Sequence, residues 1–409
     1  MTDQGEDGPR LTTREAAERL GVKAETVYAY VSRGQLTSRR SPGGRGSTFD
    51  AREVDALARK ARPESRPAGD LVFRTGITLI DGERYYFRGV DAVALAERYA
   101  YEEVVHWVWT GRPAPGARFT TPPEPLEAAR RAVGALPGHA GTMDRLRVAV
   151  IAASATDPLR FDLDREMVLS TAGGLISTLV DALPVVGRPH PGEGGIARRL
   201  WPRLTGRPSD DASLLVLDRA LALLIDHDLA ASTLAVRVAA SARAHPYAVV
   251  SAGLGALEGP LHGAASGLAH RMLSEVLERG GAAPVVADHL RAGRRVPGLG
   301  HRLYRGEDPR AQALFTALTE VPAAGPALAA ARDVVATTAR HTALHANVDL
   351  ALAVLSVASG MPAEAGETVF AVARTAGWIA HALEEYEERP LRMRPSGQYN
   401  GPRPPRPLP

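Results

Sequence analysis

The chain has 409 residues, of which 45% are hydrophobic and 23% charged, a composition typical of folded globular proteins. Cysteine is absent, which excludes disulfide bridges, cysteine metal sites and thiol catalysis. No uncharged apolar run approaches about 18 residues and the first residues show no signal-peptide pattern, so we expect a cytoplasmic protein with no membrane partner.

The net charge of +3 is unevenly distributed along the chain. Residues 11–62 carry 11 Lys and Arg against 6 Asp and Glu, whereas the remainder carries 38 against 40. This basic excess favours an anionic partner for the N-terminal segment, although a basic face on a small domain can equally be solvated surface.

The basic segment predicts a small helical domain. Thr12, followed three residues later by Glu15, is a capping-box pattern and predicts a helix through Leu20. A second helix is expected over residues 24–32 and ends before Gly34.

A hairpin wing and a third helix are expected next. The sequence SPGGRGSTF at 41–49 predicts the wing, and Asp50 with Glu53 predicts the cap of a helix through about residue 62. Two helices joined by a glycine turn and followed by a basic wing form a layout typical of DNA-reading domains.

Residues 11–36 resemble the winged helix-turn-helix domains of the MerR and excisionase type. The resemblance implies that the second helix enters the major groove of DNA. It places these residues near bases or phosphates: Lys23, Glu25, Thr26 and Tyr28 near bases, and Arg39, Arg40 and Arg45 near phosphates. A small docking module with incidental charge remains the alternative.

A proline-bearing linker is expected at 63–69, followed by short strands over 70–88 with a hairpin turn at Asp81 and Gly82. Amphipathic spacing of alanine and leucine then predicts helices through nearly all of the remaining chain. Proline- and glycine-rich loops are expected at 112–125 and 184–208.

Two glycine-flanked histidines and an aspartate suggest a catalytic site. His262 lies in GPLHG, His301 in PGLGH and Asp349 in NVD, and Arg310 follows the second histidine in DPRA. Glycine permits tight turns, and an imidazole near a helix N-terminus tends to stay neutral and can donate a hydrogen bond to a carbonyl. A carboxylate base with arginines for substrate carboxylates suits proton abstraction next to a carbonyl and carbon–carbon bond formation.

A metal site is the main rival for this region. His341, His345 and Asp349 are spaced i, i+4 and i+8, which would place them on one face of a continuous helix. The sequence HTALH lacks the glutamate of a hydrolytic zinc helix, and Asn347 suggests that a helix restarts there, so no metal is expected.

From about Phe73 to Pro402 the chain resembles citrate synthases. The segments that carry the resemblance are IDGERYYFRGVDAVALAE at 80–97, LIDHDLAASTLAVRV at 224–238, GPLHGAAS at 259–266, VPGLGHRLYRGEDPRA at 296–311, NVDLALAVL at 347–355, FAVARTAGWIAH at 370–381 and RPSGQYNGP at 394–402. The resemblance implies a mainly α-helical homodimer that acts in the tricarboxylic acid cycle. It further implies a large domain over 70–264 with 366–402 and a small domain over 265–365. The winged helix-turn-helix domain is expected over 11–62, and the proline-rich tail at 403–409 is expected to be disordered.

By resemblance, Asp349 would take a methyl proton from acetyl-CoA while His262 hydrogen-bonds the thioester oxygen, and His301 would polarise the ketone of oxaloacetate. The resemblance also implies the residues that bind the substrates: Arg310, Arg374 and, across the dimer interface, Arg394 on the carboxylates, Phe370 and His227 at the oxaloacetate pocket, and Arg305 on the phosphates of CoA. No cofactor is implied, because acetyl-CoA is a substrate.

Several positions depart from the family pattern, notably Ala230, Ala264 and Ser266 near the histidines and Leu350 with Ala351 after Asp349. Smaller residues beside the base could admit propionyl-CoA, so a 2-methylcitrate synthase is one alternative. The other is a DNA-binding regulator that uses the synthase body as a metabolite sensor.

Overall fold

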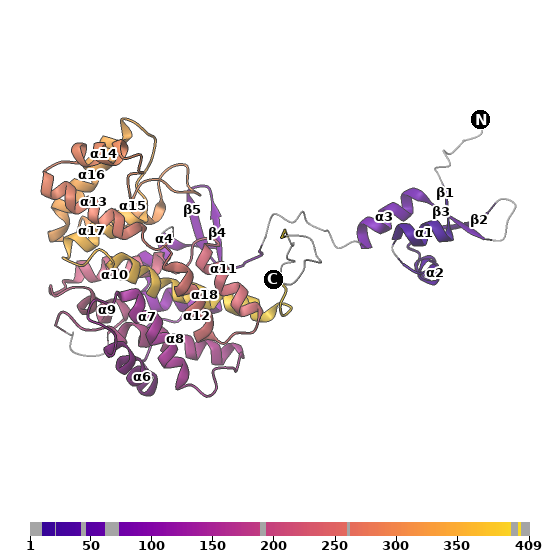
Figure 1. Ribbon diagram of the computed structural model, residues 1–409, viewed down its shortest axis with the longest axis horizontal. Helices are drawn as coiled ribbons and strands as arrows, with labels where there is room; N and C mark the ends of the chain where they lie inside the picture. Colours follow the sequence, from indigo (N-terminus) through magenta and orange to yellow (C-terminus); the bar gives the residue numbers. More distant parts are fainter. Residues whose placement is uncertain are drawn as a thin grey trace, which may run out of the picture. The chain divides into compact units, whose positions relative to one another are not determined.

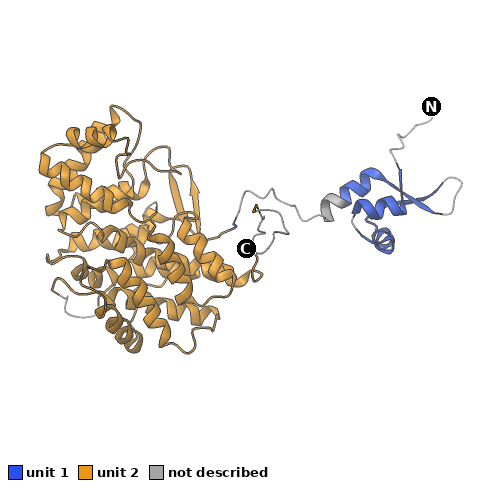
Figure 2. Cartoon of the chain, in the orientation of Figure 1, with its two compact units in different colours: residues 1–74 blue, residues 75–409 orange. Residues whose placement is uncertain are grey.

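The computed structural model describes residues 10–20, 22–41, 46–61, 73–188, 194–259, 262–393 and 400–401. The chain separates into two compact units, residues 1–74 and 75–409 (Figure 2). Gly21, Arg45, Arg394, the predicted linker at 63–69 and the predicted tail at 403–409 lie outside the described residues.

Unit 1 is a small helical domain with a three-stranded antiparallel sheet in the order β1-β3-β2. Its elements are β1 Arg10–Thr12, α1 Thr13–Leu20, α2 Ala24–Ser32, β2 Ser38–Arg40, β3 Ser47–Asp50 and α3 Ala51–Ala61 (Figure 1). Val27, Phe49 and Val54 are fully buried and form the centre of its own hydrophobic core.

The expectations for the first two helices are confirmed. The Thr12 amide donates to Glu15 Oε2 at 2.8 Å and the Glu15 amide donates to Thr12 Oγ1 at 3.3 Å, so the capping box is closed. Strand β1 was not predicted, because three residues carry no periodic signal; it is formed by pairing with β3. The cap assigned to Glu53 is wrong: its carboxylate accepts from the Thr37 amide at 2.8 Å, while Asp50 alone caps α3.

Unit 2 is almost wholly helical, which confirms the mainly α fold. Its small sheet, in the order β4-β5-β6, comprises β4 Thr78–Asp81, β5 Arg84–Phe87 and β6 Val90–Asp91. The helices of this unit are α4 Ala92–Arg98, α5 Tyr101–Thr110, α6 Pro123–Gly134, α7 Thr142–Ala155, α8 Arg165–Ala182, α9 Ile196–Leu204, α10 Asp211–Leu223, α11 Ala231–Ser241, α12 Pro246–Leu257, α13 Ala265–Arg279, α14 Ala282–Arg291, α15 Pro309–Leu318, the 3-10 turn η1 Pro322–Ala324, α16 Gly325–Ala339, α17 Val348–Ala358 and α18 Ala365–Glu387. The division of this unit into a large and a small domain stays a prediction.

The predicted hairpin forms where expected. Asp81 pairs with Arg84, so a two-residue turn joins β4 to β5, and Gly82 adopts a left-handed φ of 58° there.

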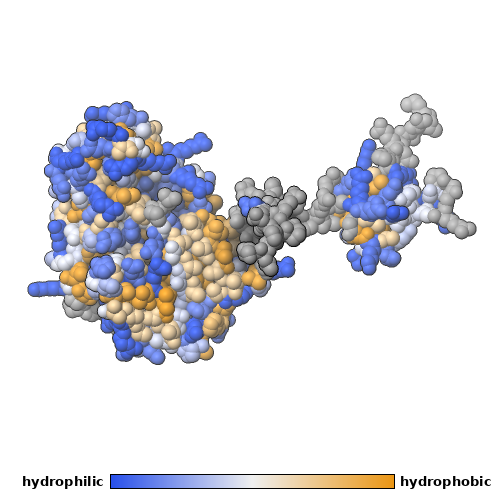
Figure 3. All heavy atoms as spheres, viewed as in Figure 1, coloured by the Kyte–Doolittle hydropathy of each residue, from blue (hydrophilic) through white to orange (hydrophobic). Residues whose placement is uncertain are grey.

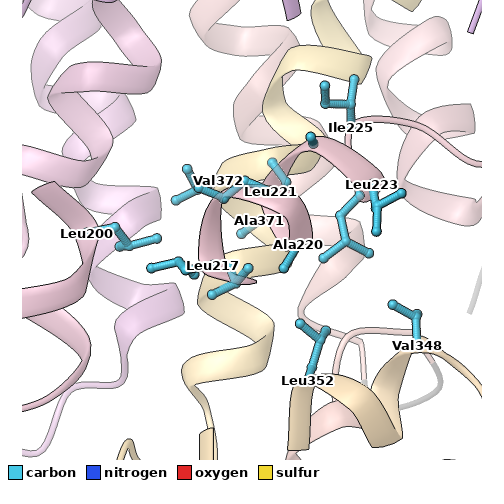
Figure 4. Close-up of a cluster of buried hydrophobic side chains, with 14 of the residues drawn as sticks. Leu200, Leu217, Ala220, Leu221, Leu223, Ile225, Val348, Leu352, Ala371 and Val372 are labelled. Atoms are coloured by element: carbon cyan, nitrogen blue, oxygen red, sulfur yellow. The ribbon is translucent and has the colours of Figure 1, made fainter. Parts of the chain in front are cut away.

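Helix α18 is the structural centre of unit 2. It packs against helices from several parts of unit 2, including α5, α8, α11, α12 and α17. Figure 4 shows side chains of α10, such as Leu217 and Leu221, beside Val372 of α18, with Val348 and Leu352 of α17 close by. This core fixes α17 and α18, the two helices that carry Asp349 and Arg374.

Helix α9 lies inside the segment expected to be a loop at 184–208, so that expectation is wrong. Proline and glycine dominate the segment, but Leu200 and Trp201 bury an apolar face and Pro202 is tolerated in the last turn. The carboxylate of Glu102 accepts from the Ile196 amide at 2.8 Å and caps the start of the helix.

Among the described residues, no single helix is long and apolar enough to cross a membrane. One bent pair, Pro309–Leu318 with Pro322–Ala339, passes by length and composition only, with a bend of 111°.

Candidate active site

The loop that carries His301 is hydrogen-bonded to the chain that leads into α17. The Gly300 amide donates to His345 O at 2.7 Å, the Asn347 amide donates to Gly298 O at 3.0 Å, and Asn347 Nδ2 donates to Gly300 O at 2.9 Å. These hydrogen bonds join the two segments that carry His301 and Asp349, which are 48 positions apart in the sequence.

Two glycines make this close approach possible. Gly298 and Gly300 have φ values of 77° and 80°, in the left-handed region that favours glycine. A Cβ atom on Gly298 would lie 2.8 Å from Leu350 Cβ, so a side chain there would push α17 away.

Asp308 connects Arg310 to the same helix. Its carboxylate accepts from Arg310 Nε at 2.9 Å and from Arg310 Nη2 at 2.8 Å, and it also accepts from the Val348 amide at 3.1 Å. Burial alone would raise the pKa of Asp308, but the guanidinium of Arg310 outweighs it and the pKa is lowered. Arg310 is thus a fixed, permanently charged group next to the start of α17.

Asp349 lies in the first turn of α17, where the Asn347 side chain caps its amide at 3.0 Å. Burial raises the pKa of Asp349 to about 6, and the nearby Arg310 opposes this shift. A carboxylate with such a pKa is ionised at neutral pH yet still basic enough to accept a proton from carbon.

His301 lies in a cluster with His227, Tyr304 and Arg310. Its ring centroid is 5.2 Å from that of His227 and 4.9 Å from that of Tyr304, and His227 Nε2 is 2.6 Å from Tyr304 Oη. The pKa of both histidines is lowered, first by burial and then by the charge of Arg310, so both rings are neutral at pH 7.

The hydrogen bonds of His301 indicate which ring nitrogen carries the proton. Its Nδ1 accepts from the Leu303 amide at 3.0 Å, which leaves the hydrogen on Nε2 in the neutral ring. Nε2 lies 3.2 Å from Arg310 Nη2, which donates one of its two hydrogens to Asp308; because the neutral ring already accepts at Nδ1, Nε2 keeps its own hydrogen and does not accept from Nη2. Two donors therefore lie side by side, an arrangement suited to a ligand oxygen.

His262 belongs to a second group with Ser232, Phe370 and Arg374. Its Nε2 is 2.8 Å from Ser232 Oγ, its ring centroid is 6.1 Å from that of Phe370, and the Arg374 guanidinium lies 4.6 Å from the Phe370 centroid. Burial, followed by the charge of Arg374, lowers the pKa of His262. It precedes α13 by three residues, as expected for an imidazole near a helix N-terminus, whereas His301 lies in a loop eight residues before α15.

Charge links the two groups. Arg374 is buried, which lowers its pKa to about 10; Asp226 opposes this shift, and the charge of Arg310 adds to it. Two guanidiniums that repel each other across a partly buried site favour a dianionic ligand between them.

The structure brings together most of the predicted residues: His227, His301, Arg310 and Asp349 in the first group, and His262, Phe370 and Arg374 in the second. Arg305 lines an adjoining cavity of about 600 Å³ with Leu303, Asp228 and the hairpin residues Thr78 and Glu83. Arg394 lies outside the described residues.

Three polar residues of the site were not predicted from the sequence: Ser232, Tyr304 and Asp308. Asp308 could have been found from its place before Pro309, since Asp followed by Pro is a helix-start signal and its side chain caps α15. Ser232 and Tyr304 carry no local signal, because their partners are 30 and 77 positions away.

The geometry of the rival metal site is not formed. Helix α16 ends at Ala339 and α17 begins at Val348, so His341, His345 and Asp349 do not share a helix, and both histidines are exposed. Within the described ranges, no group of three or more His, Cys, Asp and Glu side chains is placed to hold a metal ion.

The chain is similar to known proteins over both units. Residues 68–396 match the family model of the citrate synthase C-terminal domain, and residues 10–62 match that of a helix-turn-helix domain. The citrate synthase of Haloferax volcanii is 31% identical over 81% of this chain and 94% of its own length. The 2-methylcitrate synthase 1 of Corynebacterium glutamicum is 26% identical over 77% of this chain and 88% of its own length.

The fold agrees with these matches. The crystal structure of citrate synthase from Pyrobaculum aerophilum superimposes with a TM-score of 0.71 at 26% identity and covers 91% of this chain and 97% of that one. These similarities agree with the site, in which hydrogen bonds join the His301 and Asp349 segments and two arginines lie close by. The chain therefore belongs to the citrate synthase family and carries an N-terminal helix-turn-helix domain.

Proposed function

We propose that this protein condenses acetyl-CoA with oxaloacetate to give citrate and CoA. The observation that supports this most strongly is the shared scaffold of the site, in which Asp308 bonds both Arg310 and the start of α17, where Asp349 lies. A carboxylate base and an anion-binding arginine are thereby held together with neutral His301.

In this proposal oxaloacetate binds before acetyl-CoA, and its two carboxylates pair with arginines. Arg310 and Arg374 pair with its carboxylates, and Arg394 of the second subunit adds a third guanidinium. His301 Nε2 donates to the ketone oxygen, with His227 and Phe370 beside it, which makes the ketone carbon more electrophilic.

Acetyl-CoA is then converted to its enol. Asp349 removes a proton from the methyl carbon while His262 hydrogen-bonds the thioester oxygen; with Ser232 donating to Nε2, the hydrogen donated to that oxygen is on Nδ1. The enol carbon attacks the ketone, the new alkoxide is protonated from the His301 side, and water cleaves the citryl thioester to release CoA. In this proposal Arg305, which lines the adjoining cavity, contacts the phosphates of CoA.

The pKa of Asp349 predicts an acid limb in the rate profile. Only the ionised carboxylate can accept the methyl proton, so kcat should fall about tenfold per pH unit below about pH 6. Thiol release measured from pH 4.5 to 8 with saturating substrates tests this. A profile that stays flat down to pH 4.5 would rule out Asp349 as the titrating base.

The same pKa predicts a stability effect of Asp349→Asn. Because the folded pKa lies above the unfolded one, ionised Asp349 destabilises the fold; the cost is absent below about pH 4, grows as pH rises, and is complete above about 6. The variant should therefore unfold at higher urea than wild type at pH 8, by about 1 to 3 kcal/mol, and show no difference at pH 4. Equal midpoints at pH 8 would contradict the proposed burial cost.

Propionyl-CoA is the alternative acyl substrate, which would make the protein a 2-methylcitrate synthase. Leu350 and Ala351, the smaller residues after Asp349, are fully buried in the hydrophobic core. Acetyl-CoA and propionyl-CoA differ by one methylene, which changes binding in a pocket by about 1 to 3 kcal/mol. The preferred thioester is therefore determined by comparing the rates with both.

A homodimer fits an apolar region on unit 2. Figure 3 shows apolar residues gathered on the lower half of this unit, where Figure 1 places α7, α8 and α12. Ile151, Leu159 and Phe161, at the end of α7 and in the loop after it, are each more than 60% exposed. Exposed apolar patches of this kind are typical of subunit interfaces.

DNA binding by unit 1 is a second candidate function, supported by the helix-turn-helix match and by exposed basic side chains. Lys23 at the start of α2 and Arg40 at the end of β2 are exposed, and Tyr28 of α2 is 48% exposed. Thr26 is partly buried, and Arg39 is exposed on β2. In this proposal the synthase body acts as the metabolite sensor of a DNA-binding regulator.

Removing Lys23 and Arg40 together should weaken DNA binding. We expect Lys23→Ala with Arg40→Ala to lower the slope of log affinity against log salt by about 2, because each phosphate contact contributes about 0.9. Fluorescence anisotropy with random duplex DNA from 50 to 200 mM salt measures this. Arg52→Ala with Arg33→Ala removes the same charge from other exposed positions; equal loss in both double variants would mean that only net charge matters.

A further inference from the structure

Behind Arg374, a row of buried side chains leads away from the site. Arg374 Nη1 lies 3.5 Å from Asp226 Oδ1, His381 Nε2 lies 3.2 Å from the same oxygen, and Arg237 Nη1 lies 2.8 Å from His381 Nδ1. All four side chains are only 1 to 2% exposed. Arg237 Nη1 also donates to Glu384 Oε2 at 2.8 Å, which anchors the outer end of the row.

The row fixes the protonation of His381. A guanidinium can only donate, so His381 Nδ1 accepts from Arg237. The ring is then neutral with its hydrogen on Nε2, which points at Asp226. Arg237 therefore selects the single tautomer of His381 that donates a hydrogen bond to the aspartate.

Asp226 is held from several sides. Its Oδ2 accepts from Thr78 Oγ1 at 2.6 Å, and its Oδ1 is shared between His381 and Arg374. Burial alone would raise the pKa of Asp226, but the hydrogen bond from His381, the charge of Arg374 and the hydrogen bond from Thr78 lower it, so the carboxylate is charged. A charged carboxylate with both oxygens bonded has one orientation.

Asp226 is the ion-pair partner that offsets the buried charge of Arg374. Its guanidinium is buried and repelled by Arg310, whereas Arg310 has its own bidentate partner in Asp308. The contact with Asp226 is single and 3.5 Å long, so the direction of Arg374 depends on where Asp226 is held. Phe370 bounds the other side, with its ring centroid 4.6 Å from the guanidinium.

We propose that His381 and Asp226 are positioning residues, which hold the guanidinium of Arg374 in the orientation that binds a carboxylate of oxaloacetate. The inference rests on the proposed function, since it assumes that Arg374 binds that carboxylate. Burying a row of charged groups costs desolvation free energy, so the row gains the fold little stability. An arginine that binds a substrate carboxylate, by contrast, must be held in one orientation, and the row provides this.

Two amide variants of the histidine separate positioning from packing. In His381→Gln the amide lies near the place of Nε2 and can donate to Asp226, whereas in His381→Asn it lies near Nδ1 and cannot reach. We expect His381→Asn to raise KM for oxaloacetate about 10- to 100-fold, as for a lost hydrogen bond to a charged group, with kcat and KM for acetyl-CoA changed less than threefold. His381→Gln should recover most of the loss.

Melting temperatures of both variants are measured in parallel, with His270→Asn as control because His270 bonds Ser356 on α17, apart from this row. Equal KM values for oxaloacetate in the Asn and Gln variants would overturn the positioning role, whatever the melting temperatures. Arg374→Leu separates the binding role of Arg374 from the positioning role of His381. If Arg374→Leu leaves KM for oxaloacetate unchanged, Arg374 does not bind that substrate. If Arg374→Leu raises this KM and His381→Asn does not, only the positioning role is contradicted.

Discussion

Replacing Asp349 by alanine is expected to lower kcat about 10²- to 10⁴-fold, the usual worth of a general base. KM for oxaloacetate should stay within about twofold, because that substrate is bound by Arg310 and Arg374, whose partners Asp308 and Asp226 are untouched. Thiol release with saturating acetyl-CoA measures kcat, and titration of oxaloacetate gives KM.

The matched control is Asp211→Ala, which removes an exposed carboxylate from the first turn of α10. It should leave kcat unchanged. If Asp349→Ala retained more than about a tenth of the wild-type kcat, another group would have to be the base.

Arg310→Leu is expected to raise KM for oxaloacetate at least about 100-fold, because a buried charge that pairs with a ligand carboxylate is lost. The same change leaves Asp308 buried and without its guanidinium, which should destabilise the fold by about 3 to 5 kcal/mol. Steady-state kinetics and urea unfolding report the two effects separately.

The double variant Asp308→Asn with Arg310→Leu separates binding from stability. Both charges are removed and the Asn side chain can still accept from the Val348 amide, so stability should recover while KM stays high. Recovery of KM together with stability would mean that Arg310 serves the fold and not the substrate.

Local signals in the sequence predicted much of the secondary structure. The capping box of α1, the bounds of α2 and the hairpin at Asp81 and Gly82 depend on residues within four positions of one another. The elements that were not predicted depend on residues far away in the sequence. Strand β1 exists because β3 pairs with it, and α9 forms because Trp201 and its neighbours find a core to bury against.

The candidate site follows the same division. Motifs identified the residues that would touch substrate, such as His262, His301 and Asp349, because each is embedded in a distinctive glycine or asparagine context. The contacts that support them could not be predicted: Asp308 joins Arg310 to α17 through the Val348 amide, 40 positions away, and His381 meets Asp226 across 155 positions. Such contacts are set by the packing of α17 and α18, which no local pattern reports.

The most direct test of the proposed condensation is steady-state release of free thiol from acetyl-CoA and propionyl-CoA with oxaloacetate by the full-length protein. We predict release that depends on oxaloacetate, matches citrate or 2-methylcitrate formed one to one, and is lost in Asp349→Ala. The ratio of kcat/KM for the two thioesters then identifies the preferred acyl group. No oxaloacetate-dependent release with either thioester, from a folded protein that melts cooperatively, would contradict the proposed reaction.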